Sequence, residues 1–138
     1  WLNLSRKGKM VDKEISSDHL NETMTLRIYS PEKISTSYPF SICIVQDGND
    51  YYQMGRLATV SDRLHEDQEL HNTIFVGIHY KDKFDRREKY HPDGERNEAY
   101  IQFLGEEVIP YMERLIPNMK NEKFTCRIIS SHDKYQLS

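Results

Sequence analysis

Two serines, a histidine and an aspartate follow one another at residues 130–133, in the stretch TCRIISSHDKYQLS. These are the residue types of nucleophilic hydrolysis, in which a histidine takes the proton of a serine and an acid orients the histidine. Adjacent strand residues point to opposite faces, so His132 and Asp133 are poorly placed to form a local triad. Ser130 and Ser131 are nucleophile candidates by residue type alone.

A second polar group, Asp47, Gly48, Asn49 and Asp50, separates an apolar run from a helical pattern in VQDGNDYYQMGR. The backbone N–H groups of such a tight turn can point at a bound anion or at the oxyanion of an acyl-transfer reaction. An ordinary helix cap with a glycine turn needs the same residue types. Both interpretations stay open from residue types alone.

The third polar group is the charged stretch KDKFDRREKYHPDGER, residues 81–96. Its Arg86, Arg87, Tyr90 and His91, with Tyr51 of the preceding stretch, are candidates for the mouth of a substrate site. Because charge runs usually face water, a solvated loop is the interpretation favoured by composition.

Metal and nucleotide sites are not expected. The histidines at 65, 71 and 79 fall on different elements without the spacing of a metal site. No G-x-G-x-x-G or P-loop pattern occurs, so no cofactor is expected either.

Alternating strands and helices must position these groups. Residues 11–17 and 23–31 are expected to form a half-buried hairpin at the edge of the sheet. The almost continuously apolar stretch 40–45 and the similar stretches 72–80 and 124–129 predict buried strands. A helix capped by Asn49 or Asp50 is expected to end near Glu66. A second helical pattern buries five residues on one side, with Pro110 kinking it or dividing it in two: Tyr100, Leu104, Val108, Met112 and Leu115.

The predicted order is β-β-β-α-β-α-β, which is typical of an α/β domain with a mostly parallel sheet and an antiparallel N-terminal hairpin. Ligands of such sheets collect beyond the carboxyl ends of the strands. The fold therefore favours three segments for the chemistry: residues 47–50, residues 80–96 and the tail after residue 129.

The three segments occur in a recognisable arrangement. The stretches PFSICIVQDGNDYYQMGR, NTIFVGIHYKDKFDRREKYHPDGER and FLGEEVIPYMERLIP resemble, in order and spacing, the N-terminal half of the putative-esterase family of α/β-hydrolases, which includes enterochelin esterases and esterase D. The resemblance covers residues 24–117. It implies hydrolysis of small carboxylic esters, an oxyanion-hole N–H near Gly48 or Asn49, and a substrate mouth near residues 86–91.

The family's nucleophile elbow, a G-x-S-x-G turn, should follow the next strand. RIISSHDK falls there without a glycine, and Asp133 occupies the place of the nucleophile. The acid and base should come from later strands still. We therefore expect a single incomplete domain over residues 1–138, truncated at the nucleophile strand and inactive, with residues 1–9 an upstream remnant or disordered. Three explanations of residues 124–138 stay open at this point. They are the out-of-frame end of a truncated gene, the result of a deliberate cut, or the tail of a degenerate paralogue.

Composition limits the partners. A net charge of −3 gives no reason to expect nucleic acid or an anionic membrane, and no stretch approaches a membrane span, so the expected compartment is the cytoplasm. The apolar surroundings of Cys43 and Cys126 favour buried thiols over a disulfide. An unpaired strand at the truncated edge should drive self-association. The alternative to an esterase is a non-catalytic oligomerising fragment or a module that binds a small ligand.

Overall fold

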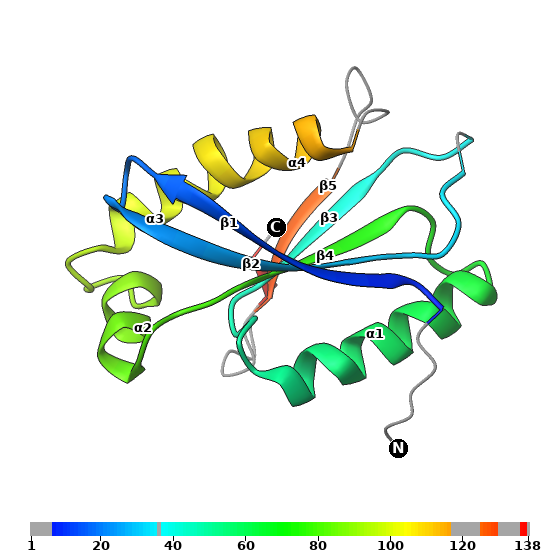
Figure 1. Cartoon of the computed structure of the whole chain (residues 1–138), viewed down its shortest axis with the longest axis horizontal. Coiled ribbons are helices and arrows are strands. Elements are labelled where there is room, and N and C mark those ends of the chain that lie inside the picture. Colours follow the sequence, from blue (N-terminus) through cyan, green and yellow to red (C-terminus); the bar gives the residue numbers. More distant parts are fainter. Residues whose placement is uncertain (1–6, 36, 117–124, 130–135, 138) are drawn as a thin grey trace.

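The computed structural model describes residues 7–35, 37–116, 125–129 and 136–137, which form one mixed sheet with helices on both faces (Figure 1). Strand order in the sheet is β1-β2-β4-β3-β5-β6. The strands are β1 (Lys9–Ser17), β2 (Glu22–Ser30), β3 (Ser41–Val45), β4 (Thr73–Ile78), β5 (Thr125–Ile129) and β6 (Gln136–Leu137). The helical segments are α1 (Tyr51–Glu66), α2 (Lys83–Tyr90), α3 (Asn97–Phe103), the π-helical η1 (Leu104–Val108) and α4 (Ile109–Leu115).

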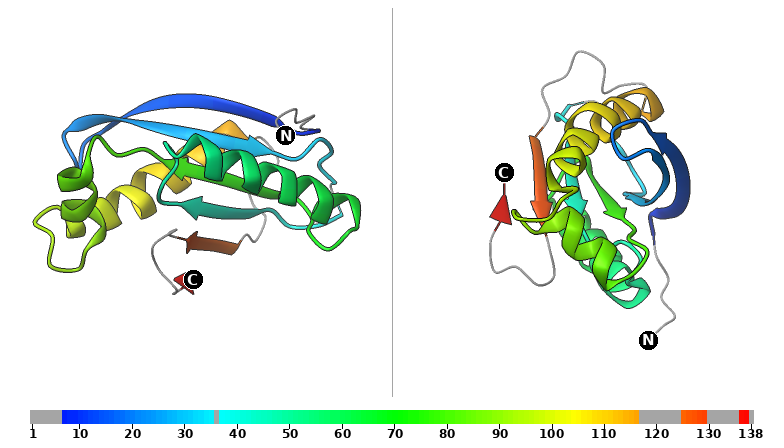
Figure 2. Two further views of the ribbon diagram at one scale, coloured as in Figure 1. Left: turned by 90° about the horizontal axis from the view of Figure 1, so that it is seen from below. Right: turned by 90° about the vertical axis from the view of Figure 1, so that its left-hand side faces the viewer.

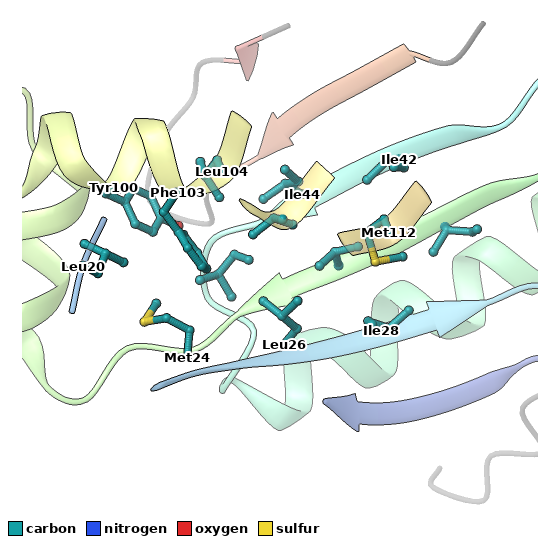
Figure 3. Packing of buried hydrophobic residues seen from close by; sticks show 14 of the residues in the cluster. Leu20, Met24, Leu26, Ile28, Ile42, Ile44, Tyr100, Phe103, Leu104 and Met112 are labelled. Carbon is teal, nitrogen blue, oxygen red and sulfur yellow. The ribbon is translucent and has the colours of Figure 1, made fainter. Parts of the chain in front are cut away.

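Alternation along the strands divides the core into two layers. Every residue of β4 is buried: Ile74, Val76 and Ile78 join the cluster beneath α3, η1 and α4, whereas Phe75 joins the cluster beneath α1. Figure 3 shows the larger layer, and Figure 2 shows the helices on either side of the sheet. Burying each such aliphatic side chain contributes about 1.5–3 kcal/mol, which is why the two central strands are almost wholly apolar.

The α/β class is confirmed, but the expectation of a mostly parallel sheet is wrong. Among the described strands, the β3–β4 and β3–β5 pairings are parallel, whereas the β1–β2, β2–β4 and β5–β6 pairings are antiparallel. The physical reason is that β2, after its hairpin with β1, continues as the antiparallel neighbour of β4. The hairpin thus supplies a strand inside the sheet as well as one at its edge.

Helix α1 follows the local signals of the sequence. Asp50 is the N-cap, and its side chain accepts a hydrogen bond of 3.0 Å from the backbone N–H of Gln53. Met54 and Ala58, one turn apart, are buried against the sheet. The predicted cap and the predicted end at Glu66 are confirmed.

The polar stretch 81–96 is partly helical, which corrects the expectation of a solvated loop. Helix α2 begins after Asp82, whose side chain accepts from the N–H of Asp85 at 2.8 Å. Asp85 and Lys89, one turn apart, are both buried and lie 3.0 Å from each other. The charges of this stretch therefore pair inside the protein, and that pairing fixes the helix.

The second long helical pattern is one run with a widened turn. The segment η1 has π-helical hydrogen bonding, including Ile109 N–H to the carbonyl of Leu104, and it precedes Pro110, which has no N–H to donate. Tyr100, Leu104, Val108 and Met112 are buried as predicted. Leu115, with 38% of its surface exposed, is not, because the run ends there.

Two observed elements, helix α2 and the short strand β6, are missing from the element order predicted from the sequence. No helix within the described ranges is long and apolar enough to cross a membrane.

Candidate functional site

The turn after β3 carries the candidate oxyanion donors. Gly48 donates its backbone N–H to the carbonyl of Ile78 at 2.9 Å, and Asp50 donates its own to the carbonyl of Asp47 at 2.9 Å. The N–H of Asn49 has no acceptor among the described residues. Of the two N–H groups that the sequence nominated, that of Gly48 is therefore bonded, whereas that of Asn49 is unbonded within the described ranges and lies beside the positive end of the α1 dipole.

Two glycines allow this turn to lie directly on β4. A Cβ placed on Gly48 would lie 2.2 Å from the carbonyl carbon of Gly77, and one placed on Gly77 would lie 2.6 Å from the Cα of Gly48. No side chain fits between two backbones this close. The position of the Asn49 N–H therefore depends on a contact between two glycines.

Asp47 and Arg86 join the turn to α2. The carboxylate of Asp47 is buried and lies 3.0 Å from the Nε of Arg86. The guanidinium lies over the rings of Tyr80 and Tyr90, 5.8 and 5.2 Å from their centroids. Burial lowers the pKa of Arg86, but the hydrogen bond to Asp47 and the negative charge of its carboxylate outweigh this effect and hold the pKa above its ordinary value. Arg86 is thus a fixed cation beside the turn.

Tyr90 fastens α2 to the end of β3 by donating its hydroxyl to the carbonyl of Gln46. Burial, together with the nearby charge of Asp47, raises the pKa of Tyr90 well above its ordinary value, so the hydroxyl stays protonated and remains a donor. Its role in this geometry is to hold α2 over the carboxyl end of the sheet.

A further charged group on the α1 face was not predicted from the sequence. Arg27 of β2 holds Asp12 of β1 through two hydrogen bonds of 2.9 and 3.1 Å. It also donates to the carbonyl of Gly48 at 3.4 Å, and its guanidinium lies 5.5 Å from the ring centroid of Tyr51. The hydrogen bond from Arg27 lowers the pKa of Asp12. The available signal was a lone arginine in β2, on the face opposite Leu26 and Ile28.

His79 lies beside this group at the end of β4, where burial and the charge of Arg27 lower its pKa. The imidazole is therefore neutral near pH 7. Its Nε2 is buried without a hydrogen-bond partner in the described part of the chain.

His65 and His71 lie apart from the turn. His65 accepts from the N–H of Thr73 through Nε2 and bonds the carbonyl of Ser61 through Nδ1, and His71 stacks on Tyr38 with 3.8 Å between ring centroids. Both line a pocket of about 360 Å³ at the amino end of β4, opposite the turn. No cluster of metal-ligating side chains occurs among the residues that the structure describes.

The predicted site residues fall into three groups. The structure brings together Asp47, Gly48, Asn49, Asp50, Tyr51, Arg86 and Tyr90. Arg87 is exposed on α2, and His91 is exposed at its end, where its Nδ1 accepts from the N–H of Asp93. Ser130, Ser131, His132 and Asp133 lie outside the described residues.

The chain is similar to esterases and hydrolases over most of its length. The family described as "Putative esterase" matches residues 17–127. The "Uncharacterized protein YjcH" of Bacillus subtilis (strain 168) is 36% identical over 112 residues, which are 81% of this chain and 47% of that protein. The chain thus spans about half the length of this relative.

Solved structures share the fold at low sequence identity. The enterobactin esterase FES from Shigella flexneri has a TM-score of 0.67 at 16% identity, over 79% of this chain and 27% of that one. An IroE-like serine hydrolase from Shewanella oneidensis has a TM-score of 0.62 at 20% identity, over 78% and 39%. With the family match over residues 17–127, these findings establish that the chain belongs to the putative esterase family.

Proposed function

We propose that this chain supplies the oxyanion-binding half of an esterase site, with the backbone N–H of Asn49 as the donor. The observation that carries the proposal is the difference between two backbone N–H groups of the turn. The N–H of Gly48 is bonded to Ile78, whereas that of Asn49 is unbonded within the described residues. An N–H fixed in this way, at the start of a helix, stabilises the charge that develops on a carbonyl oxygen when an ester is attacked.

The position of the turn supports the same role. β5 runs parallel to β3 and pairs with it as far as Val45 and Ile129, so the two strands end side by side. In this family the nucleophile follows the strand equivalent to β5. A carbonyl held between the two strand ends would meet the nucleophile on one side and the Asn49 N–H on the other.

The substrate class follows from the family: small carboxylic esters. Arg86 lies next to the turn, and its side chain is 22% exposed. It is suited to hold a polar or anionic part of the ester or acid. Tyr51, 63% exposed at the start of α1, lies on the other side of the turn, with its ring 5.5 Å from the guanidinium of Arg27.

These 138 residues contain no G-x-S-x-G turn. We therefore propose that on their own they bind an oxyanion without completing hydrolysis. The nucleophile, acid and base would have to be supplied by other residues, from a longer chain or from a second one.

Methylphosphonate, a tetrahedral anion that mimics the oxyanion, tests the proposal. In the ¹⁵N-labelled chain we expect it to shift the amide resonance of Asn49 saturably and that of Gly48 much less. Asn49→Pro removes the N–H and should weaken binding about tenfold, as expected for losing one hydrogen bond to a charged group. Asn49→Ala keeps the N–H and should bind like the unsubstituted chain.

Two results would contradict this proposal. An unmoved Asn49 amide, or equal affinity for Asn49→Pro and Asn49→Ala, would remove the assigned donor. Hydrolysis of p-nitrophenyl acetate that Ser130→Ala or Ser131→Ala abolishes would show that the chain is catalytically complete.

Self-association is proposed from the free edge of β5. β6 pairs with Ile128 and Ile129 only, so residues 125–127 have no strand on that side within the described ranges. Sedimentation at micromolar concentration should show a dimer or larger species, which Thr125→Lys weakens because edge charges oppose strand pairing. Glu14→Lys on the charged β1 edge is the control and should change little. A monomer at every concentration would refute the idea.

A further inference from the structure

Arg27 occupies a defined place between two strands and the turn. In the sheet register it lies opposite Asp12 of β1 on one side and opposite Gly77 of β4 on the other. Gly77 is also the residue against which Gly48 packs. The missing side chain of Gly77 therefore leaves room for the turn to reach the guanidinium.

Both backbone polar groups of Gly48 are held from outside the turn. Its N–H donates to the carbonyl of Ile78, and its carbonyl accepts from Nη1 of Arg27 at 3.4 Å. Arg27 is itself held by two hydrogen bonds to Asp12, and its side chain is only 16% exposed. A short turn whose anchors come from two other strands has little freedom to rotate its peptide groups.

The carbonyl of Gly48 and the N–H of Asn49 belong to one peptide group. Among the described residues no peptide bond is cis, and in a trans peptide the C=O and N–H bonds point in opposite directions. A guanidinium that fixes the carbonyl toward β2 therefore turns the N–H away from β2. In the sheet order β2-β4-β3-β5, that is the side of β3 on which β5 lies.

We propose that Arg27 is a positioning residue that orients and polarises the Asn49 N–H through the carbonyl of the same peptide group. This inference rests on the proposed oxyanion role of Asn49 and extends it to a side chain that touches neither substrate nor nucleophile. A cation bonded to the carbonyl draws electron density from the peptide and strengthens its N–H as a donor. Asp12 keeps the guanidinium in place.

The fork of an arginine suits this task. Two of its nitrogens bond the carboxylate of Asp12 while Nη1 reaches the carbonyl of Gly48. Lysine has a single nitrogen and cannot keep this planar arrangement. Arg27→Lys therefore preserves the charge and separates the effect of geometry from that of net charge.

The experiment compares Arg27→Gln, Arg27→Lys and Asp12→Asn with Arg56→Gln, a control at an exposed arginine of α1. We expect Arg27→Gln to move the carbonyl ¹³C resonance of Gly48 upfield and to weaken methylphosphonate binding about fivefold, which is one hydrogen bond of about 1 kcal/mol. For both the Gly48 carbonyl resonance and the affinity for methylphosphonate, Arg27→Lys and Asp12→Asn should give values between those of Arg27→Gln and the unsubstituted chain. Arg56→Gln should give the values of the unsubstituted chain. Melting temperatures identify any variant that is merely unfolded.

The outcomes separate this inference from the proposed function. If folded Arg27→Gln and Arg27→Lys keep the Gly48 carbonyl resonance and the affinity unchanged, Arg27 does not position the donor. If the carbonyl resonance moves but methylphosphonate binds no form of the chain, Arg27 orients the peptide and the oxyanion role fails. A loss of affinity in Arg56→Gln as large as in Arg27→Gln would overturn the inference, because net charge would then explain both.

Discussion

Replacing Gly48 with alanine is expected to lower the free energy of unfolding by about 3 kcal/mol, the upper part of the usual range for overpacking. The added Cβ would lie 2.2 Å from the carbonyl carbon of Gly77, 2.6 Å from its Cα and 2.6 Å from its oxygen. These are backbone atoms of a central strand and cannot move aside as a flexible side chain can. The turn would have to lift away, which also stretches the hydrogen bond from Gly48 to Ile78. Urea unfolding followed by circular dichroism measures the effect.

Gly105→Ala is the matched control. Gly105 is exposed in η1, and a Cβ there would meet nothing within 4 Å. The same substitution should therefore be neutral or stabilise the protein by up to about 1 kcal/mol, since alanine is the better helix former. Equal effects at both positions would show that the contact between Gly48 and Gly77 does not constrain the turn.

Replacing Lys89 with methionine should destabilise the protein by about 3 kcal/mol, as expected when one partner of a buried ion pair is removed. Lys89 is 1% exposed, with its Nζ 3.0 Å from Asp85 and 3.4 Å from Glu22. Methionine fits the space but leaves two carboxylates with no buried cation beside them: Arg96, 2.6 Å from Glu22, is 36% exposed, and Lys81, 3.6 Å from Glu22, is 70% exposed. Thermal or urea unfolding near pH 7 gives the size of the loss.

Lys81→Met is the control, because Lys81 also faces Glu22, at 3.6 Å, but is 70% exposed. Its loss should cost less than about 1 kcal/mol, as for other surface pairs. Adding Asp85→Asn to Lys89→Met should recover part of the stability. If the Lys89→Met protein is as stable as the Lys81→Met protein, the buried cluster of Lys89, Asp85 and Glu22 does not hold α2 in place.

In acid, the difference in the free energy of unfolding between the unsubstituted and the Lys89→Met proteins should become smaller. Burial raises the pKa of Asp85, but hydrogen bonds from the N–H of Lys81 and from Lys89 outweigh it, so the pKa lies below its ordinary value. A depressed pKa stabilises the fold at pH above the unfolded value, about 4, and this contribution is lost as pH falls through the folded value. The deficit of Lys89→Met should therefore shrink in strong acid.

Features set by neighbouring residues were predictable from the sequence. Asp50 caps α1 through Gln53, three residues away, and the helix ends at Glu66 as its pattern predicts. Helix α2 was missed because its stability comes from distant contacts: Lys89 meets Glu22, 67 positions earlier in the chain. A helix as short as α2 is marginal without such tertiary contacts.

The candidate site likewise has features that are set by neighbouring residues and features that depend on distant contacts. The turn at Gly48 was found because Asp-Gly-Asn-Asp follows an apolar run, but which of its N–H groups is available depends on the carbonyl of Ile78 across the sheet. The contact of Arg27 with Gly48 spans 21 positions and depends on the register of β2 on β4. The antiparallel placement of β2 inside the sheet was not anticipated, so neither was this contact.

The widened turn η1 acts as a spacer of one residue in the helical run that covers the larger core. Four buried residues spaced by four, from Tyr100 to Met112, would drift around a regular α-helix, because each residue turns it by about 100°. The π-helical turn absorbs that drift and returns Val108 and Met112 to the sheet. In this helix, chain length between Phe103 and Pro110 is therefore as restricted as residue type, since one residue fewer would direct a different side of α4 toward the core.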